Sequence, residues 1–185
     1  MRWVACLLAL SVLVGACGGR VQPVPDQPRG GTVAMMITSP AFEEEGSIPA
    51  DYTCQGQNSS PALAWSEVPV GTKSLALICD DPDAPVGTFI HWVLYNIPAD
   101  ATGLPAGITS QEALENGAMQ GVNGARKSGY TGPCPPSGTH RYYFKLHALD
   151  KVLDLKPGAT KDQLLKAMEG HILAQGQLMG RYQKR

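Results

Sequence analysis

The sequence predicts a mainly β fold, most simply an antiparallel β-sandwich with a few short helices and one helix near the C-terminus. Apolar runs rich in β-favouring residues recur between turn signals. The gaps between these runs are crowded with proline and glycine, a pattern typical of short strands joined by long loops. Helix signals are scarce before residue 160. Two packed antiparallel sheets would account for all three observations.

Four segments are predicted to be strands: 33–38, 74–79, 89–97 and 141–149. In the last of these, residues 140, 142, 144, 146 and 148 share one face, which reads His, Tyr, Phe, Leu, Ala and is therefore predicted to be buried. His140 and Tyr142 are expected to emerge together where the strand leaves the core. The opposite face, which includes Arg141 and His147, is predicted to be solvent-exposed.

One amphipathic helix is predicted after residue 160. Thr160 and Gln163 have the spacing of a capping box. Apolar residues follow at helical intervals as far as Ile172 and Leu173, so we expect the helix to continue that far and to lie on the sheet. His171, in the same stretch, is expected to be structural.

The N-terminus is predicted to be a secretion signal. Residues 1–16 combine an early arginine with an apolar run and small residues, and V-G-A-C at 14–17 resembles a lipobox, in which Cys17 would be lipidated. A plain signal peptide or a short anchor helix is the alternative. Residues 17–32 would form the lipidated terminus and a flexible tether, and residues 33–185 one domain. Gly18 after the cysteine favours the outer membrane, facing the periplasm, over the inner membrane.

Composition limits the expected partners. Loss of residues 1–16 leaves 185 − 16 = 169 residues and removes one arginine, so 15 − 1 = 14 basic residues face 16 acidic ones. No basic cluster is present that could displace counterions from phosphates, so nucleic acid is not an expected partner.

Three cysteines remain after Cys17. Cys79 ends an apolar run and suits a buried strand, whereas Cys54 and Cys134 lie in loop-like sequence. Outside the cytoplasm such a pair should oxidise, so we predict a Cys54–Cys134 disulfide, with three free thiols as the alternative.

Polar residues that could form a site lie at the ends of two predicted strands. Asp81 and Asp83, in the DPDAP turn, follow one strand, and His91 begins the next. We expect the two carboxylates to share a small volume and His91 to donate a hydrogen bond to them. The alternative is that the aspartates only cap a turn and that His91 is a core histidine. With His140 and Tyr142, these side chains could converge on one pocket.

Several motifs together resemble the phosphatidylethanolamine-binding protein family, in its bacterial Raf-kinase-inhibitor-like branch. They are SSPALAW, DPDAP, HWVLYNIP, GPCPPSGTHRY and HILAQGQLMGRY, which lie in order between residues 33 and 183. The resemblance implies an antiparallel β-sandwich with a small anion pocket for phosphate or a phospholipid headgroup. On this chain the implied ligand-binding residues are Asp81, Asp83, His91, Gly132, Pro133, His140 and Tyr142.

The expected function is therefore non-catalytic binding of an anionic small ligand: phosphate, phosphoethanolamine or a phospholipid headgroup. No cofactor or metal is expected, and the membrane would be contacted through the N-terminal lipid. Protonated His91 or His140, the Tyr142 hydroxyl and backbone N–H groups could offset the carboxylates, so binding should strengthen as pH falls. The alternatives are an inhibitor of a protease or kinase, which would bind a protein partner, and a metal-dependent hydrolase with two Asp and two His as ligands.

Overall fold

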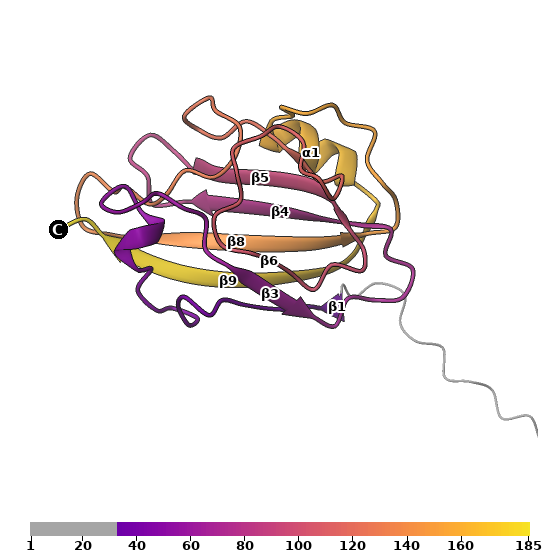
Figure 1. The fold of residues 1–185 in the computed structure, drawn as a ribbon, viewed down its shortest axis with the longest axis horizontal. Coiled ribbons are helices and arrows are strands. Elements are labelled where there is room, and N and C mark those ends of the chain that lie inside the picture. Colours follow the sequence, from indigo (N-terminus) through magenta and orange to yellow (C-terminus); the bar gives the residue numbers. More distant parts are fainter. Residues whose placement is uncertain (1–32) are drawn as a thin grey trace, which may run out of the picture. The chain divides into compact units, whose positions relative to one another are not determined.

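A computed structural model describes residues 33–185 of the chain (Figure 1). The predicted signal peptide (1–16), the lipidation of Cys17 and the tether (17–32) lie outside the described residues and stay predictions. The elements are, in order, β1 (Val33–Ala34), β2 (Met36–Thr38), η1 (Ala50–Tyr52), β3 (Leu63–Ser66), β4 (Ser74–Asp81), β5 (Phe89–Pro98), β6 (Gly103–Leu104), β7 (Met119–Gln120), β8 (Thr139–Leu149), α1 (Lys161–Met168) and β9 (Ile172–Gln183).

The strands form two sheets, which confirms the predicted mainly β class. The larger sheet has the order β1-β9-β8-β4-β5-β7, and the smaller has the order β2-β3-β6. All pairings are antiparallel except that of β1 with β9. In Figure 1, β3 and β6 cross in front of the large sheet. The main core lies between the sheets, because Trp65 and Leu104 of the small sheet share a buried cluster with Leu77, Trp92 and Phe144 of the large one.

The predicted strand at 33–38 is divided between the sheets. β1 pairs with β9 in the large sheet, whereas β2 pairs with β3 in the small one. Between them, the Met35 N–H donates to the Gln175 carbonyl over 2.8 Å. The other three predicted strands are present as β4, β5 and β8.

The predicted C-terminal helix is present but shorter than expected. Its capping box is formed, since the Thr160 hydroxyl accepts from the Gln163 N–H and the Gln163 side chain accepts from the Thr160 N–H. The helix ends at Met168, and Gly170 adopts a φ of +74°, a left-handed conformation that favours glycine and stops a helix. The prediction that the helix reaches Leu173 is therefore wrong.

Residues 172–183 form strand β9, which antiparallel pairing with β8 stabilises along its length. On one face of β9, the buried residues Ala174, Leu178 and Tyr182 recur at every fourth position, with Gly176 and Gly180 between them, and Met179 is buried on the other face. A Cβ at Gly176 would lie 2.5 Å from the Met35 carbonyl oxygen, so only glycine fits there. The apolar spacing of this segment fits both a helix and a strand, and pairing with β8 decides for the strand.

A second buried layer covers the other face of β4 and β5. Leu164 and Met168 of α1 share a cluster with Ala76, Ile78 and Val93. All eight residues of β4 are therefore buried. Within residues 33–185, no helix is long and apolar enough to span a bilayer.

His147 belongs to this second face, not to a solvent-exposed one as predicted. It lies directly opposite Ala76 in the β4–β8 register, and only 8% of its surface is exposed. Its Nδ1 has no hydrogen-bond partner among the described residues. Burial, with a smaller contribution from nearby Lys145, lowers the pKa of His147 to about 4.

We expect the protein to lose stability below pH 6.5 through His147, and the His147→Gln variant to lose less. In the unfolded chain this imidazole binds a proton near pH 6.5, whereas in the folded chain it does so only near pH 4. Protons therefore favour the unfolded chain in this window, and the free energy of unfolding should fall by on the order of 3 kcal/mol from this group. Urea unfolding at pH 7, 5.5 and 4 measures the loss.

The matched control for this experiment is His171→Gln, which removes a partly exposed histidine paired with Asp150 at 2.8 Å. The same pH dependence in wild type and His147→Gln would contradict the assignment.

Candidate functional site

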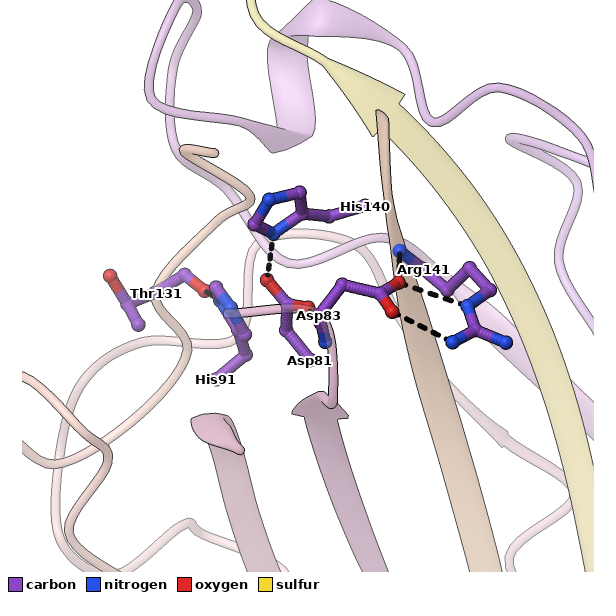
Figure 2. Close-up of polar contacts among 6 residues, drawn as sticks. All are labelled: Asp81, Asp83, His91, Thr131, His140 and Arg141. Carbon is purple, nitrogen blue, oxygen red and sulfur yellow. Dashed lines mark hydrogen bonds and ion pairs between the residues drawn. The ribbon is translucent and has the colours of Figure 1, made fainter. Parts of the chain in front are cut away.

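The polar residues predicted from the strand ends meet at one edge of the large sheet. β4 pairs antiparallel with both β5 and β8, so its last residue, Asp81, lies beside the first residues of these two strands. His91 is the third residue of β5 and His140 the second of β8. Figure 2 shows the Asp81 carboxylate between the two imidazole-bearing segments.

A cavity of about 220 Å³ lies over these three side chains. Asp81, His91, Gly132 and His140 of the predicted set line it. No lysine or arginine of residues 33–185 is among its lining residues. The rest of the wall is uncharged and largely apolar: Ala84, Pro85, Val86, Phe89, Thr131, Cys134, Pro135 and Pro136.

Asp81 is bonded to His140, not to His91 as predicted. His140 Nδ1 lies 2.7 Å from Asp81 Oδ2, and both residues are more than 90% buried. The other oxygen of Asp81 accepts the backbone N–H of Asp83 over 2.8 Å. Since Nδ1 of His140 is engaged with the carboxylate, Nε2 is the ring atom left to contact a ligand.

His91 is held by the loop that follows residue 130. Its Nδ1 lies 2.6 Å from the Thr131 carbonyl oxygen, which can only accept, so this nitrogen carries the hydrogen. Burial lowers the pKa of His91, although Asp81 and the Thr131 carbonyl oppose the shift. Near neutral pH this imidazole is therefore uncharged, and its Nε2 is an acceptor.

Tyr142 and Pro133 do not line the cavity. Tyr142 is fully buried, so the prediction that it emerges beside His140 is wrong, and its ring packs edge-on against His91 at 5.1 Å between centroids. Its hydroxyl has no hydrogen-bond partner among the described residues, and burial together with the Asp81 charge raises the pKa of Tyr142. Pro133 is also buried, and its carbonyl accepts the Cys54 N–H over 3.1 Å.

Asp83 faces away from the cavity and pairs with Arg141, so the two carboxylates do not share a volume as predicted. The guanidinium donates from Nε to Asp83 Oδ2 over 2.9 Å and from Nη2 to Oδ1 over 2.7 Å (Figure 2). The Arg141 backbone N–H also donates to Oδ2, over 2.9 Å. These bonds lower the pKa of Asp83 to about 2.

Arg141 is the residue of this site that sequence reasoning missed. Alternation with the buried His140 and Tyr142 predicts a solvent-facing side chain at this position and says nothing of a partner. A signal was present in the sequence: His140 and Arg141 are adjacent on a predicted strand and so face opposite sides, and the DPDAP turn carries two carboxylates, one for each.

The predicted Cys54–Cys134 disulfide is present, with a Cα–Cα distance of 5.4 Å, and Cys79 is free and buried. The bond attaches the cavity loop to the segment around η1. The Tyr130 hydroxyl donates to the Tyr52 carbonyl of that segment over 2.8 Å.

Gly132 lies at the closest approach of the same two segments. Its N–H donates to Asn58 Oδ1 over 2.7 Å. A Cβ at this position would lie 2.5 Å from the Tyr52 carbonyl oxygen, so no side chain fits. The loop that fixes His91 is therefore itself fixed by the disulfide and by these contacts.

A metal-dependent hydrolase would need two Asp and two His side chains to converge as ligands. Among the described residues, no group of three or more His, Cys, Asp or Glu side chains is placed to hold a metal ion. Asp83, one of the four ligands that the hydrolase alternative would need, is turned toward Arg141.

A β-sandwich with a small Asp/His cavity at one sheet edge is the class of protein that the fold and site define. The chain matches the family model for phosphatidylethanolamine-binding protein over residues 38–183. The UPF0098 protein of Methanothermobacter thermautotrophicus is 53% identical over 150 residues, which cover 81% of this chain and 99% of the relative. That of Pyrococcus abyssi is 42% identical over 189 residues and the alignment spans all of both chains.

Solved structures agree with this assignment. A phosphatidylethanolamine-binding protein homologue from Chlamydia trachomatis is 46% identical, with a TM-score of 0.77 over 83% of this chain and 100% of that one. YbcL of E. coli, a member of the mammalian phosphatidylethanolamine-binding protein family, is 31% identical, with a TM-score of 0.75 over 82% of this chain and 99% of that one. The chain belongs to the phosphatidylethanolamine-binding protein family.

We expect the Cys54→Ser/Cys134→Ser double variant to be less stable than the oxidised wild type by roughly 4 kcal/mol. The bond closes a loop with a sequence separation of 80 residues, and the chain-entropy model gives this size of effect for such a loop. Guanidinium unfolding with and without a dithiol reductant measures it. Wild type should fall to the level of the double variant on reduction, whereas the double variant should not respond.

Cys79→Ala is the control, because it removes the free buried thiol and should keep the response to reductant. A reductant-insensitive wild type would contradict the pairing.

Proposed function

We propose that this protein binds a small phosphate-bearing ligand, best a zwitterionic one such as phosphoethanolamine or the headgroup that contains it, without transforming it. The observation that carries the proposal is the convergence of Asp81, His91 and His140 on one cavity with otherwise uncharged walls. Family membership supports the same reading, because the family model is described by its binding of phosphatidylethanolamine.

Charge balance favours a zwitterion over a simple anion. Asp81 is a buried carboxylate at the cavity, and like charges about 4 Å apart repel by about 1 kcal/mol even in water and by more at a protein surface. The Thr131 and Gly132 N–H groups are engaged with the His91 carbonyl and Asn58, so the loop has few donors left for phosphate. An ammonium group facing Asp81, with phosphate oxygens near the imidazoles, would offset the repulsion.

Cavity size favours a headgroup or a free phosphate ester. Pockets for drug-sized ligands start at about 300 Å³. At about 220 Å³ this cavity is smaller, so the acyl chains of a whole phospholipid would have to lie outside it.

We also propose that the protein acts in the cell envelope, anchored through lipidated Cys17. The V-G-A-C sequence at 14–17 supports the anchor, and a disulfide between Cys54 and Cys134 suits an oxidising compartment.

We expect phosphoethanolamine to bind more tightly than inorganic phosphate, and both to bind about tenfold more tightly at pH 5 than at pH 8. The pH effect follows because a protonated imidazole adds a positive charge and an N–H donor beside Asp81. Since burial lowers the pKa of His91, its share of the effect should appear below pH 6.5. Calorimetric titration at pH 8, 6 and 5 measures these affinities.

Sulfate is the control ligand, because it does not take up a proton in this range and so reports on the protein's protons alone. His140→Gln and His91→Gln should each weaken binding and flatten the pH dependence. Absence of binding at every pH, or equal binding of phosphoethanolamine to wild type and to both variants, would refute the proposed function.

A further inference from the structure

The two aspartates of the DPDAP turn contact strand β8 on its two opposite faces. His140 and Arg141 are neighbours on β8, so their side chains point to opposite sides of the sheet. Asp81 contacts His140 on the core side over 2.7 Å, and Asp83 contacts Arg141 on the outer side over 2.7 Å (Figure 2).

The two contacts are mechanically linked through the turn. The Asp83 backbone N–H donates to Asp81 Oδ1 over 2.8 Å, so the place of Asp83 helps to set the orientation of the Asp81 carboxylate. Asp83 in turn accepts three hydrogen bonds from Arg141, two from the guanidinium and one from the backbone N–H. A paired fork geometry of this kind fixes direction as well as distance.

We propose that Asp83 and Arg141 are positioning residues that hold the Asp81–His140 pair in the orientation that the ligand needs, and that Asp83 does not itself contact the ligand. This inference rests on the proposed function for its effect on affinity. It differs from the role that the family resemblance implied for Asp83, because the carboxylate is turned from the cavity and saturated by Arg141.

The Asp83–Arg141 pair also affects the net charge near the cavity. Arg141 neutralises the Asp83 carboxylate on the outer face, and among residues 33–185 Asp81 is the one carboxylate that lines the cavity. With Arg141 removed, the Asp83 charge would be uncompensated two residues from Asp81, and it would disfavour a phosphate in the cavity. Loss of either side chain also removes the two guanidinium hydrogen bonds that hold Asp83 against β8.

A double-mutant cycle on phosphoethanolamine affinity tests the proposal. Asp83→Ala and Arg141→Ala should each weaken binding by about tenfold, and the double variant should be no weaker than either within about twofold, because both substitutions break the same contact. If Asp83 contacted the ligand directly, Asp83→Ala would be the more damaging change, Arg141→Ala would have little effect and the losses would add. That result, or full affinity in both single variants, would overturn the proposal.

Two further variants test whether the effect depends on the charge of Asp83 and on Arg141 in particular. Asp83→Asn keeps a side-chain oxygen for the Arg141 N–H but loses the charge, and should fall between wild type and Asp83→Ala. Arg181→Ala is the matched control: Arg181 lies opposite Arg141 in the β8–β9 register and pairs with Glu45 at 2.9 Å, away from the lining of the cavity. This variant should keep the wild-type affinity. A tenfold loss would overturn the proposal, because it would show that removal of any arginine on this face weakens binding.

A measurement on the unliganded protein separates the positioning role from the proposed function. The Nδ1–H proton of His140, bonded to Asp81, should give a downfield NMR signal that Arg141→Ala shifts and exposes to faster exchange, while Arg181→Ala leaves it unchanged. If wild type binds no phosphoethanolamine, the proposed function fails, but a changed signal still supports the positioning role. An unchanged signal in Arg141→Ala overturns that role whatever the affinities are.

Discussion

The hydrogen bond between His140 and Asp81 joins residues 59 positions apart, and it depends on the register in which β8 pairs with β4. Side chains alternate along a strand with a period of two, so a slip of one residue would present Arg141 to the core side and His140 to the outer side. Burial of Phe144 and Leu146 on the core side makes such a slip costly. The apolar core thus fixes the polar site at its edge.

The sequence was most informative where one physical signal dominated. Continuous apolar runs predict β4 and β5, alternation of buried and exposed residues predicts β8, and the ends of these three strands bring Asp81, His91 and His140 to one place. It was least informative where two signals competed. In residues 172–183 apolar side chains fit both a helical and a two-residue period, and pairing with β8, which no local pattern reports, decided for a strand.

The hydrogen-bond partners within the site also could not be predicted from the sequence. Asp81 could have bonded to either imidazole, and the choice of His140 follows from register and from the Thr131 carbonyl, which engages His91 over 2.6 Å. The burial of His147 could not be read from β8 alone, because the layer formed with α1 covers a face that alternation had left for solvent. In each case contacts between distant segments decided the outcome.

Three carboxylates at the end of β4 are compensated in three different ways. Asp80, 1% exposed, faces the second layer and is paired with Lys145 and Lys161 at 2.8 and 2.7 Å, and Asp83 is paired with a guanidinium. Both kinds of partner stay charged at neutral pH. Asp81 instead has the imidazole of His140, which carries a charge only when it is protonated. Because a buried carboxylate needs compensation, Asp81 is the one of the three whose balance a proton, or the ammonium of a ligand, can complete.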